Sequence, residues 1–225
     1  MPTTRSSKTA GACGLGFVAF AAAAFVLENV GAPSGDTVSN AKLVSYLTDH
    51  KDGLQGAAVL MALGGLLFLG FLGGLRERLE RGGARATVPI AAGALFVGGL
   101  FTYAALKAAI PQALDYAKPY TVDTNTARVL EPLSYTSLIY VSIAAAAMVI
   151  GVSYIAAGHG LLPSWLTRGG YGAAALSVIS SVAFIPLGPP LAGVWVVAVS
   201  IVMLRDARVV PAANAERGTV AHSRA

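Results

Sequence analysis

Long apolar stretches alternate with short polar ones along most of the chain. Residues 53–75 and residues 86–110 form two such stretches, and a basic loop separates them. The loop carries Arg76, Arg78, Arg81 and Arg85. Because about 20 helical residues cross a bilayer core of roughly 30 Å, each stretch is long enough to span a membrane. The pattern therefore predicts membrane helices joined by loops.

The same pattern over the whole chain predicts an all-α fold, a polytopic membrane bundle of six transmembrane helices within residues 1–208. The predicted spans are residues 13–30, 54–75, 87–110, 133–157, 170–185 and 188–204. The last of these is short, so whether it crosses the bilayer fully is left open. Residues 209–225 have mixed polarity and no apolar periodicity, which predicts a disordered cytoplasmic tail.

A short helix is also predicted between the first two spans, at residues 37–50. Leu43, Tyr46 and Leu47 share one face of it, which fits a helix that lies on the outer surface or caps the bundle. Asp36 or Thr37 can serve as its N-cap. Three prolines, Pro111, Pro119 and Pro132, are expected to break the helices around the longest outer loop.

Lysine and arginine are unevenly distributed between the two sides that six spans create. Eleven of the 16 lie on the side that holds both termini, and five lie on the other side. Basic residues are retained in the cytoplasm, so this excess predicts cytoplasmic N and C termini. An odd number of spans would place either the first or the last basic residues outside.

Composition supports a membrane protein without a separate soluble domain. Hydrophobic residues make up 55% of the chain and charged residues 12%, whereas soluble domains carry about 25% charged residues. The net charge of +5 comes from clusters at the ends of apolar stretches and not from one basic face, which argues against nucleic-acid binding. Abundant alanine, glycine and arginine suggest a GC-rich bacterial genome. We therefore expect a multi-pass protein of the bacterial plasma membrane.

Three segments resemble a known family. They are NAKLVSYLTDH at residues 40–50, FLGGLRERL at residues 71–79 and GLLPSWL at residues 160–166. Together they resemble the DUF4386-like group, multi-pass membrane proteins of the actinobacterial type. That group carries an AK-hydrophobic-hydrophobic-x-aromatic-x-x-x-H segment before its second helix and a G-x-L-P-x-W-L turn after its fourth. The resemblance covers most of the chain and implies its architecture, but no activity.

Polar and ionisable side chains gather at the predicted outer ends of the spans. Such groups are costly in a membrane and are candidates for function. Tyr103 and Lys107 are neighbours four residues apart on one helix, as are Glu131 and Tyr135 on another. Our hypothesis is an outward-facing vestibule that binds a small ligand or a lipid headgroup. Its members are Glu28, Gln55, Tyr103, Lys107, Glu131 and Tyr135. The alternative is that each side chain extends separately to the outer headgroups.

No motif for catalysis or metal binding is found. Cys13 is the single cysteine, and the predicted topology places His50 and His159 on opposite sides of the membrane. No G-x-S-x-G motif is present. No acidic residue lies near the middle of a span, which argues against a proton-coupled pump. We therefore predict no catalytic residues, no metal and no cofactor.

These observations leave three classes of function. The first is a non-enzymatic envelope protein that binds a lipid or a protein partner. The second is a small transporter or channel subunit that uses the outer vestibule, and the third is a membrane enzyme that acts on a lipid. Gly70 and Gly74 form a small-xxx-small pair, which can serve packing within one chain or a homo-oligomer. The first class is our prediction, and the second is its main alternative.

Overall fold

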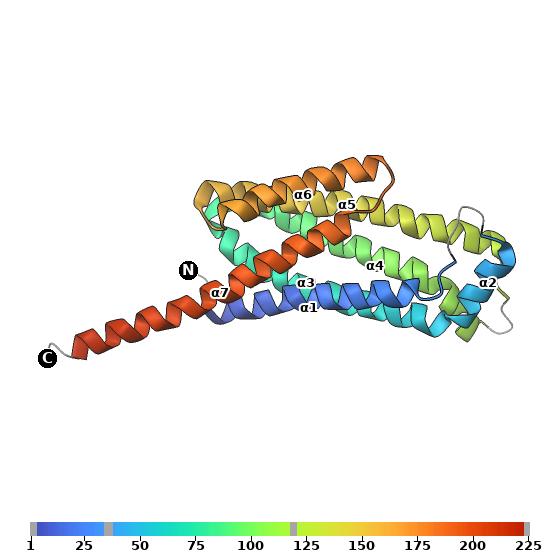
Figure 1. Ribbon diagram of the computed structural model, residues 1–225, viewed down its shortest axis with the longest axis horizontal. Helices are drawn as coiled ribbons and strands as arrows, with labels where there is room; N and C mark the ends of the chain where they lie inside the picture. Colours follow the sequence, from blue (N-terminus) through green and yellow to red (C-terminus); the bar gives the residue numbers. More distant parts are fainter. Residues whose placement is uncertain (1–3, 34–37, 118–120, 223–225) are drawn as a thin grey trace.

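The computed structural model describes residues 4–33, 38–117 and 121–222, and over these ranges the chain is helical without any strand. The helices form an elongated bundle, with α2 across one end and α7 projecting beyond the other (Figure 1). The elements are α1 (Thr4–Asn29), α2 (Asn40–Asp49), α3 (Lys51–Leu79), the 3₁₀ segment η1 (Glu80–Ala86), α4 (Thr87–Tyr116), α5 (Thr124–His159), α6 (Ser164–Val182) and α7 (Gly188–His222).

Five of these helices are long and apolar enough to cross a membrane. The qualifying segments are Ser6–Asn29, Lys51–Leu79, Gly82–Tyr116, Thr124–His159 and Gly188–Asp206. The chain is thus a multi-pass helical membrane protein by length and composition. The sequence marks the last span as the weak one, but its helix qualifies. The helix that falls short is α6, because Arg168, threonine and three glycines dilute its first half.

Two helices are longer than a bilayer requires. At 1.5 Å per residue, the 30 residues of α4 extend about 45 Å and the 36 residues of α5 about 54 Å. Their ends meet α2, where Tyr46 and Leu47 pack with Leu54, Ile110 and Ala127 in a small core of their own. The predicted outer helix therefore caps the bundle. The α6–α7 turn reaches only partway along α5 (Figure 1).

Aromatic packing joins the middle of α1, α3 and α4. The rings of Phe17 and Phe68 lie 4.8 Å apart between centroids, and those of Phe68 and Phe96 lie 5.1 Å apart. All three side chains are at most 3% exposed. Apolar burial between helices adds little stability in lipid, so the contribution comes from close contact of interlocking rings. This cluster sets the distance between the three helices.

Small residues let α1 approach α3 closely. A Cβ atom on Gly74 would lie 2.2 Å from the Cβ of Ala10, and one on Gly70 would lie 3.0 Å from the Sγ of Cys13. Both glycines therefore pack against α1 of the same chain. Intramolecular packing accounts for the small-xxx-small pair, while a homo-oligomer through Gly70 and Gly74 stays a prediction.

Both ends of the chain's membrane region meet at one end of the bundle. The Ser7 hydroxyl donates to the carbonyl of Met203 over 3.0 Å, which ties α1 to α7. The Arg78 guanidinium donates to the Ser7 hydroxyl and to the Asp206 carboxylate, both over 3.0 Å. The start of α1, the end of α3 and residue 206 of α7 therefore lie together.

Two prolines lie inside helices that they were expected to break. Pro111 is buried within α4, which continues to Tyr116, and Pro132 lies in the third turn of α5, which begins at Thr124. Each proline removes one backbone hydrogen bond, and tertiary contacts offset that loss. The neighbour of Pro111, Ile110, packs in the small core under α2. Pro119 lies outside the described residues.

Helix ends also differ from the predicted boundaries. The helix predicted for residues 37–50 starts at Asn40, because the Ser39 hydroxyl accepts a hydrogen bond from the N–H of Lys42 over 3.3 Å. The earlier cap candidates, Asp36 and Thr37, lie outside the described residues. At the start of α5, the Asp123 carboxylate accepts hydrogen bonds from the first turn, and these bonds lower the pKa of Asp123.

The last two helices change the predicted boundaries most. The span predicted at residues 170–185 is α6, which begins six residues earlier, after Pro163. Beyond residue 208, α7 continues to His222, in place of the predicted disordered tail. This segment is rich in alanine, the best helix former. It also extends an existing helix, so no new helical nucleus is required.

Candidate functional site

The candidate site lies at the capped end of the bundle, where three helices each contribute a charged side chain. Glu28 stands in the last turn of α1, Lys107 in the second half of α4, and Glu131 in the second turn of α5. Tyr103 precedes Lys107 by one helical turn, so both side chains leave α4 on the same face. Four of the six predicted residues therefore come together.

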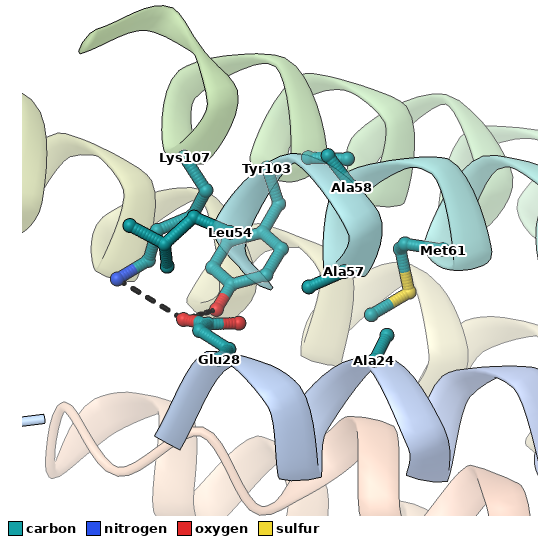
Figure 2. A pocket seen from close by; sticks show the side chains of 9 residues that line it. Ala24, Glu28, Leu54, Ala57, Ala58, Met61, Tyr103 and Lys107 are labelled. Atoms are coloured by element: carbon teal, nitrogen blue, oxygen red, sulfur yellow. Dashed lines mark hydrogen bonds and ion pairs between the residues drawn. The ribbon is translucent and has the colours of Figure 1, made fainter. Parts of the chain in front are cut away.

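Lys107 is the centre of this group. Its Nζ lies 3.0 Å from the Oε1 of Glu28 and 2.8 Å from the Oε2 of Glu131. The Tyr103 hydroxyl donates to the same Oε1 of Glu28. Figure 2 shows both contacts converging on the Glu28 carboxylate, with Leu54 of α3 beside them. The ammonium also lies 5.9 Å from the centre of the Tyr103 ring. We call Glu28, Tyr103, Lys107 and Glu131 the outer cluster.

The short helix α2 covers the outer cluster. The Tyr46 hydroxyl donates to the backbone carbonyl of Glu28, one of the last carbonyls of α1 that lack a partner within the helix. Tyr46 is only 8% exposed, and its burial raises the pKa of the phenol above its ordinary value. The neutral phenol thus fixes α2 to the end of α1.

The other two predicted residues lie outside the outer cluster. The Gln55 side chain donates to the Oδ2 of Asp115 over 2.8 Å, and Lys51 forms an ion pair with the same carboxylate. These residues connect the start of α3 to the end of α4 and form a second, more exposed group. Tyr135 lies one turn beyond Glu131 and is 47% exposed, which fits an anchor at the membrane surface.

The outer cluster encloses almost no free space. The cavity beside Glu28, Tyr103 and Lys107 has a volume of about 10 Å³, and its remaining wall is made of alanine, leucine and methionine. A single water molecule needs at least that much room. The charged groups also satisfy one another. The arrangement can hold α1, α4 and α5 in register, but it leaves no room for a small ligand as it stands.

Sequence reasoning missed three members of this region. Tyr46 was identified only as part of the apolar face of α2, and its hydroxyl is what gives it a polar role. Lys51 and Asp115 were assigned to loops and prove to be partners across α3 and α4. No local signal pairs them, because they are 64 positions apart.

Within the described ranges, no three His, Cys, Asp or Glu side chains gather closely enough to hold a metal ion. His50 lies between α2 and α3, at the capped end, and His159 ends α5 at the opposite end. Comparison with protein-family models, with curated proteins and with solved structures returned no match.

Proposed function

We propose that this chain is a non-enzymatic protein of the bacterial plasma membrane that binds a lipid or a protein partner, with six spans and both termini in the cytoplasm. The observation that carries the proposal is the closed outer cluster. A transporter vestibule needs solvent-accessible polar groups, whereas Glu28, Lys107 and Glu131 are paired with one another beside about 10 Å³ of space. Binding at the surface of the bundle fits this arrangement better than passage through it.

The place where the ends meet supports the proposed number of spans. Ser7 of α1 contacts Met203 of α7, so the membrane region of the chain begins and ends at the same end of the bundle. This arrangement favours an even number of crossings, and our proposal counts α6 beside the five apolar helices to give six. Its 19 residues extend about 28 Å, close to the thickness of the hydrocarbon core.

The orientation rests on charge. Arg76 and Arg78, near the end of α3, lie at the end of the bundle where α1 begins. Arginine-rich loops stay in the cytoplasm, so this end is the inner one and α2 covers the outer one. The resemblance to the DUF4386-like group is consistent with this architecture and adds no activity.

Two measurements test the proposal. A reporter that is active only in the cytoplasm, fused after Ala225 and separately after Ala117 at the end of α4, should be active at the first site and inactive at the second. Proteoliposomes of the purified chain should show no ion conductance above that of empty vesicles. Conductance that Lys107→Met alters would favour the alternative, a transporter or channel subunit. Chemical change of a co-purified lipid would favour an enzyme.

A further inference from the structure

A groove of about 660 Å³ opens at the end of the bundle opposite the outer cluster. It lies between η1, the end of α5 and the first half of α6. Its residues are Gly82, Arg85, Tyr154, Ile155, Ala157, Gly158, His159 and Tyr171. Its volume falls in the range of small-molecule sites, about 300–1,000 Å³.

The groove is lined both by small residues and by large polar ones. Ala157 and Gly158 lie one turn beyond Tyr154 on α5, so small side chains follow the tyrosine on that face and leave space beside the helix. Gly82 holds η1 against α5, since a Cβ there would lie 2.8 Å from Ile155. Gly83 has a φ of +58°, which bends η1 in a way that other residues rarely adopt. Arg85 follows that bend, lines the groove and is exposed.

The groove offers hydrogen-bond donors and positive charge. Arg85 and His159 are both exposed, and neither forms any of the ion pairs found in the part of the chain that the structure describes. Tyr154 and Tyr171 also line the groove, and each carries a hydroxyl that can donate a hydrogen bond. A guanidinium and phenols at the membrane surface complement a phosphodiester, which carries one negative charge and several acceptor oxygens.

An apolar stripe leads from the groove toward the middle of the bundle. Ile143, Ile150 and Tyr154 lie on one face of α5 at helical spacing, and they are 47%, 41% and 59% exposed. This stripe gives acyl chains a surface that is continuous with the groove. Free phosphate would use the groove but not the stripe, so their combination favours a lipid.

We propose that this groove binds the headgroup of an anionic phospholipid of the inner leaflet, with its phosphate at Arg85 and its acyl chains along the exposed face of α5. The proposal rests on the proposed function, because it takes the topology and the binding role from it. It adds the class of lipid and the residues that select it.

The test uses the full-length protein in bilayer nanodiscs that contain equal parts of phosphatidylcholine and phosphatidylglycerol. Lipids retained after release from the nanodisc are counted by native mass spectrometry. Arg85→Gln removes the charge, and Gly158→Leu fills the groove at an exposed position where a Cβ would meet nothing within 4 Å. The matched controls are Arg76→Gln, an exposed arginine on α3 at the same end, and Gly172→Leu, an exposed glycine on α6 with open space around it.

We expect the wild type to retain phosphatidylglycerol in preference to phosphatidylcholine. Arg85→Gln should reduce that preference about fivefold, the effect of one basic residue at a membrane surface, and Gly158→Leu should reduce it comparably. Both controls should leave it unchanged. An equal loss of the preference for phosphatidylglycerol in Arg76→Gln would assign that preference to surface charge in general. It would overturn the assignment of lipid binding to the groove. Displacement of phosphatidylglycerol by millimolar inorganic phosphate would make free phosphate the ligand.

The outcomes separate the two proposals. If the protein retains phosphatidylglycerol equally in the wild type and in both groove variants, the groove assignment fails and the binding role stands. If no lipid of either kind is retained and vesicles that contain the protein conduct ions, both the groove assignment and the proposed function fail. Circular dichroism of each variant verifies that the helical content is intact. Because one variant acts through charge and the other through shape, misfolding of one leaves the other as a test.

Discussion

Replacing Lys107 with methionine removes the only ammonium group of the outer cluster and keeps most of the side-chain volume. The carboxylates of Glu28 and Glu131 then lie close together without a counter-charge, although Glu28 keeps the hydrogen bond from the Tyr103 hydroxyl. One oxygen of each carboxylate lies within 3.0 Å of the Lys107 nitrogen, so these two oxygens are at most about 6 Å apart. At that distance, two unit charges repel by roughly 3 kcal/mol at an effective dielectric constant of about 20. Removing one partner of a buried ion pair costs about 3–5 kcal/mol.

Partial exposure reduces this cost. The Glu28 side chain is 13% exposed, but that of Glu131 is 36% exposed and can be hydrated. We therefore expect Lys107→Met to lower the free energy of unfolding by about 2–4 kcal/mol. The matched control is Lys51→Met, which breaks a pair whose side chains are 36% and 31% exposed, and whose loss should cost less than about 1 kcal/mol.

The assay is equilibrium unfolding in mixed micelles, followed by far-ultraviolet circular dichroism as the denaturing detergent is increased. Adding Glu28→Gln to Lys107→Met removes one of the two opposed charges and should recover about half of the loss. A loss for Lys107→Met no greater than that for Lys51→Met would refute the reasoning. So would a further loss on adding Glu28→Gln, because the carboxylates would then be hydrated independently of one another.

Three other predictions concern packing, capping and pH. Gly74→Leu should destabilise the fold by about 1–3 kcal/mol, because its Cβ would meet that of Ala10 at 2.2 Å, whereas Gly73→Leu, with nothing within 4 Å, should be near neutral in the same unfolding assay. Tyr46→Phe should cost about 1 kcal/mol and speed amide hydrogen exchange in α2, since it removes the bond to the end of α1; unchanged exchange would contradict this role. The pKa of Asp123 is lower in the folded chain than its ordinary value of 3.8, so its capping bonds stabilise the start of α5 above that value and are lost as pH falls through the lower folded pKa. Amide exchange in the first turn of α5 should accelerate over that acidic range in the wild type but not in Asp123→Ala, and parallel profiles would contradict the assignment.

The all-helical fold and the five long apolar helices could be predicted because apolar stretches of about 20 residues have few alternatives in lipid. Helix ends were harder to predict. Pro111 and Pro132 have the local signature of helix breakers, and only contacts between distant segments show that α4 and α5 continue past or begin before them. The hydrogen bond between Ser7 and Met203 joins residues 196 positions apart. It depends on the axial position of α7 relative to α1, which no local sequence pattern encodes.

The candidate site was predictable in part for a similar reason. Tyr103 and Lys107 share a face at helical spacing, and helix ends on one side of a membrane lie at similar depth, so their approach to Glu28 could be expected. The position of Gln55 could not be predicted, because its partner Asp115 lies on the part of α4 that was assigned to a loop. The free volume inside the cluster depends on the packing of alanines and Met61, and charge patterns say nothing about it.

The outer cluster can be completed only late in the synthesis of the chain. Glu28 is synthesised first, Lys107 after two further helices, and Glu131 last, so α1 enters the membrane with a carboxylate in its last turn that has no counter-charge yet. Translation must reach α5 before all three charges can be neutralised and the end of the bundle can close. Truncated nascent chains that stop before residue 87, and so lack Tyr103 and Lys107, should therefore remain accessible to carboxylate-modifying reagents at Glu28, whereas in the finished protein the Glu28 side chain is paired and 13% exposed.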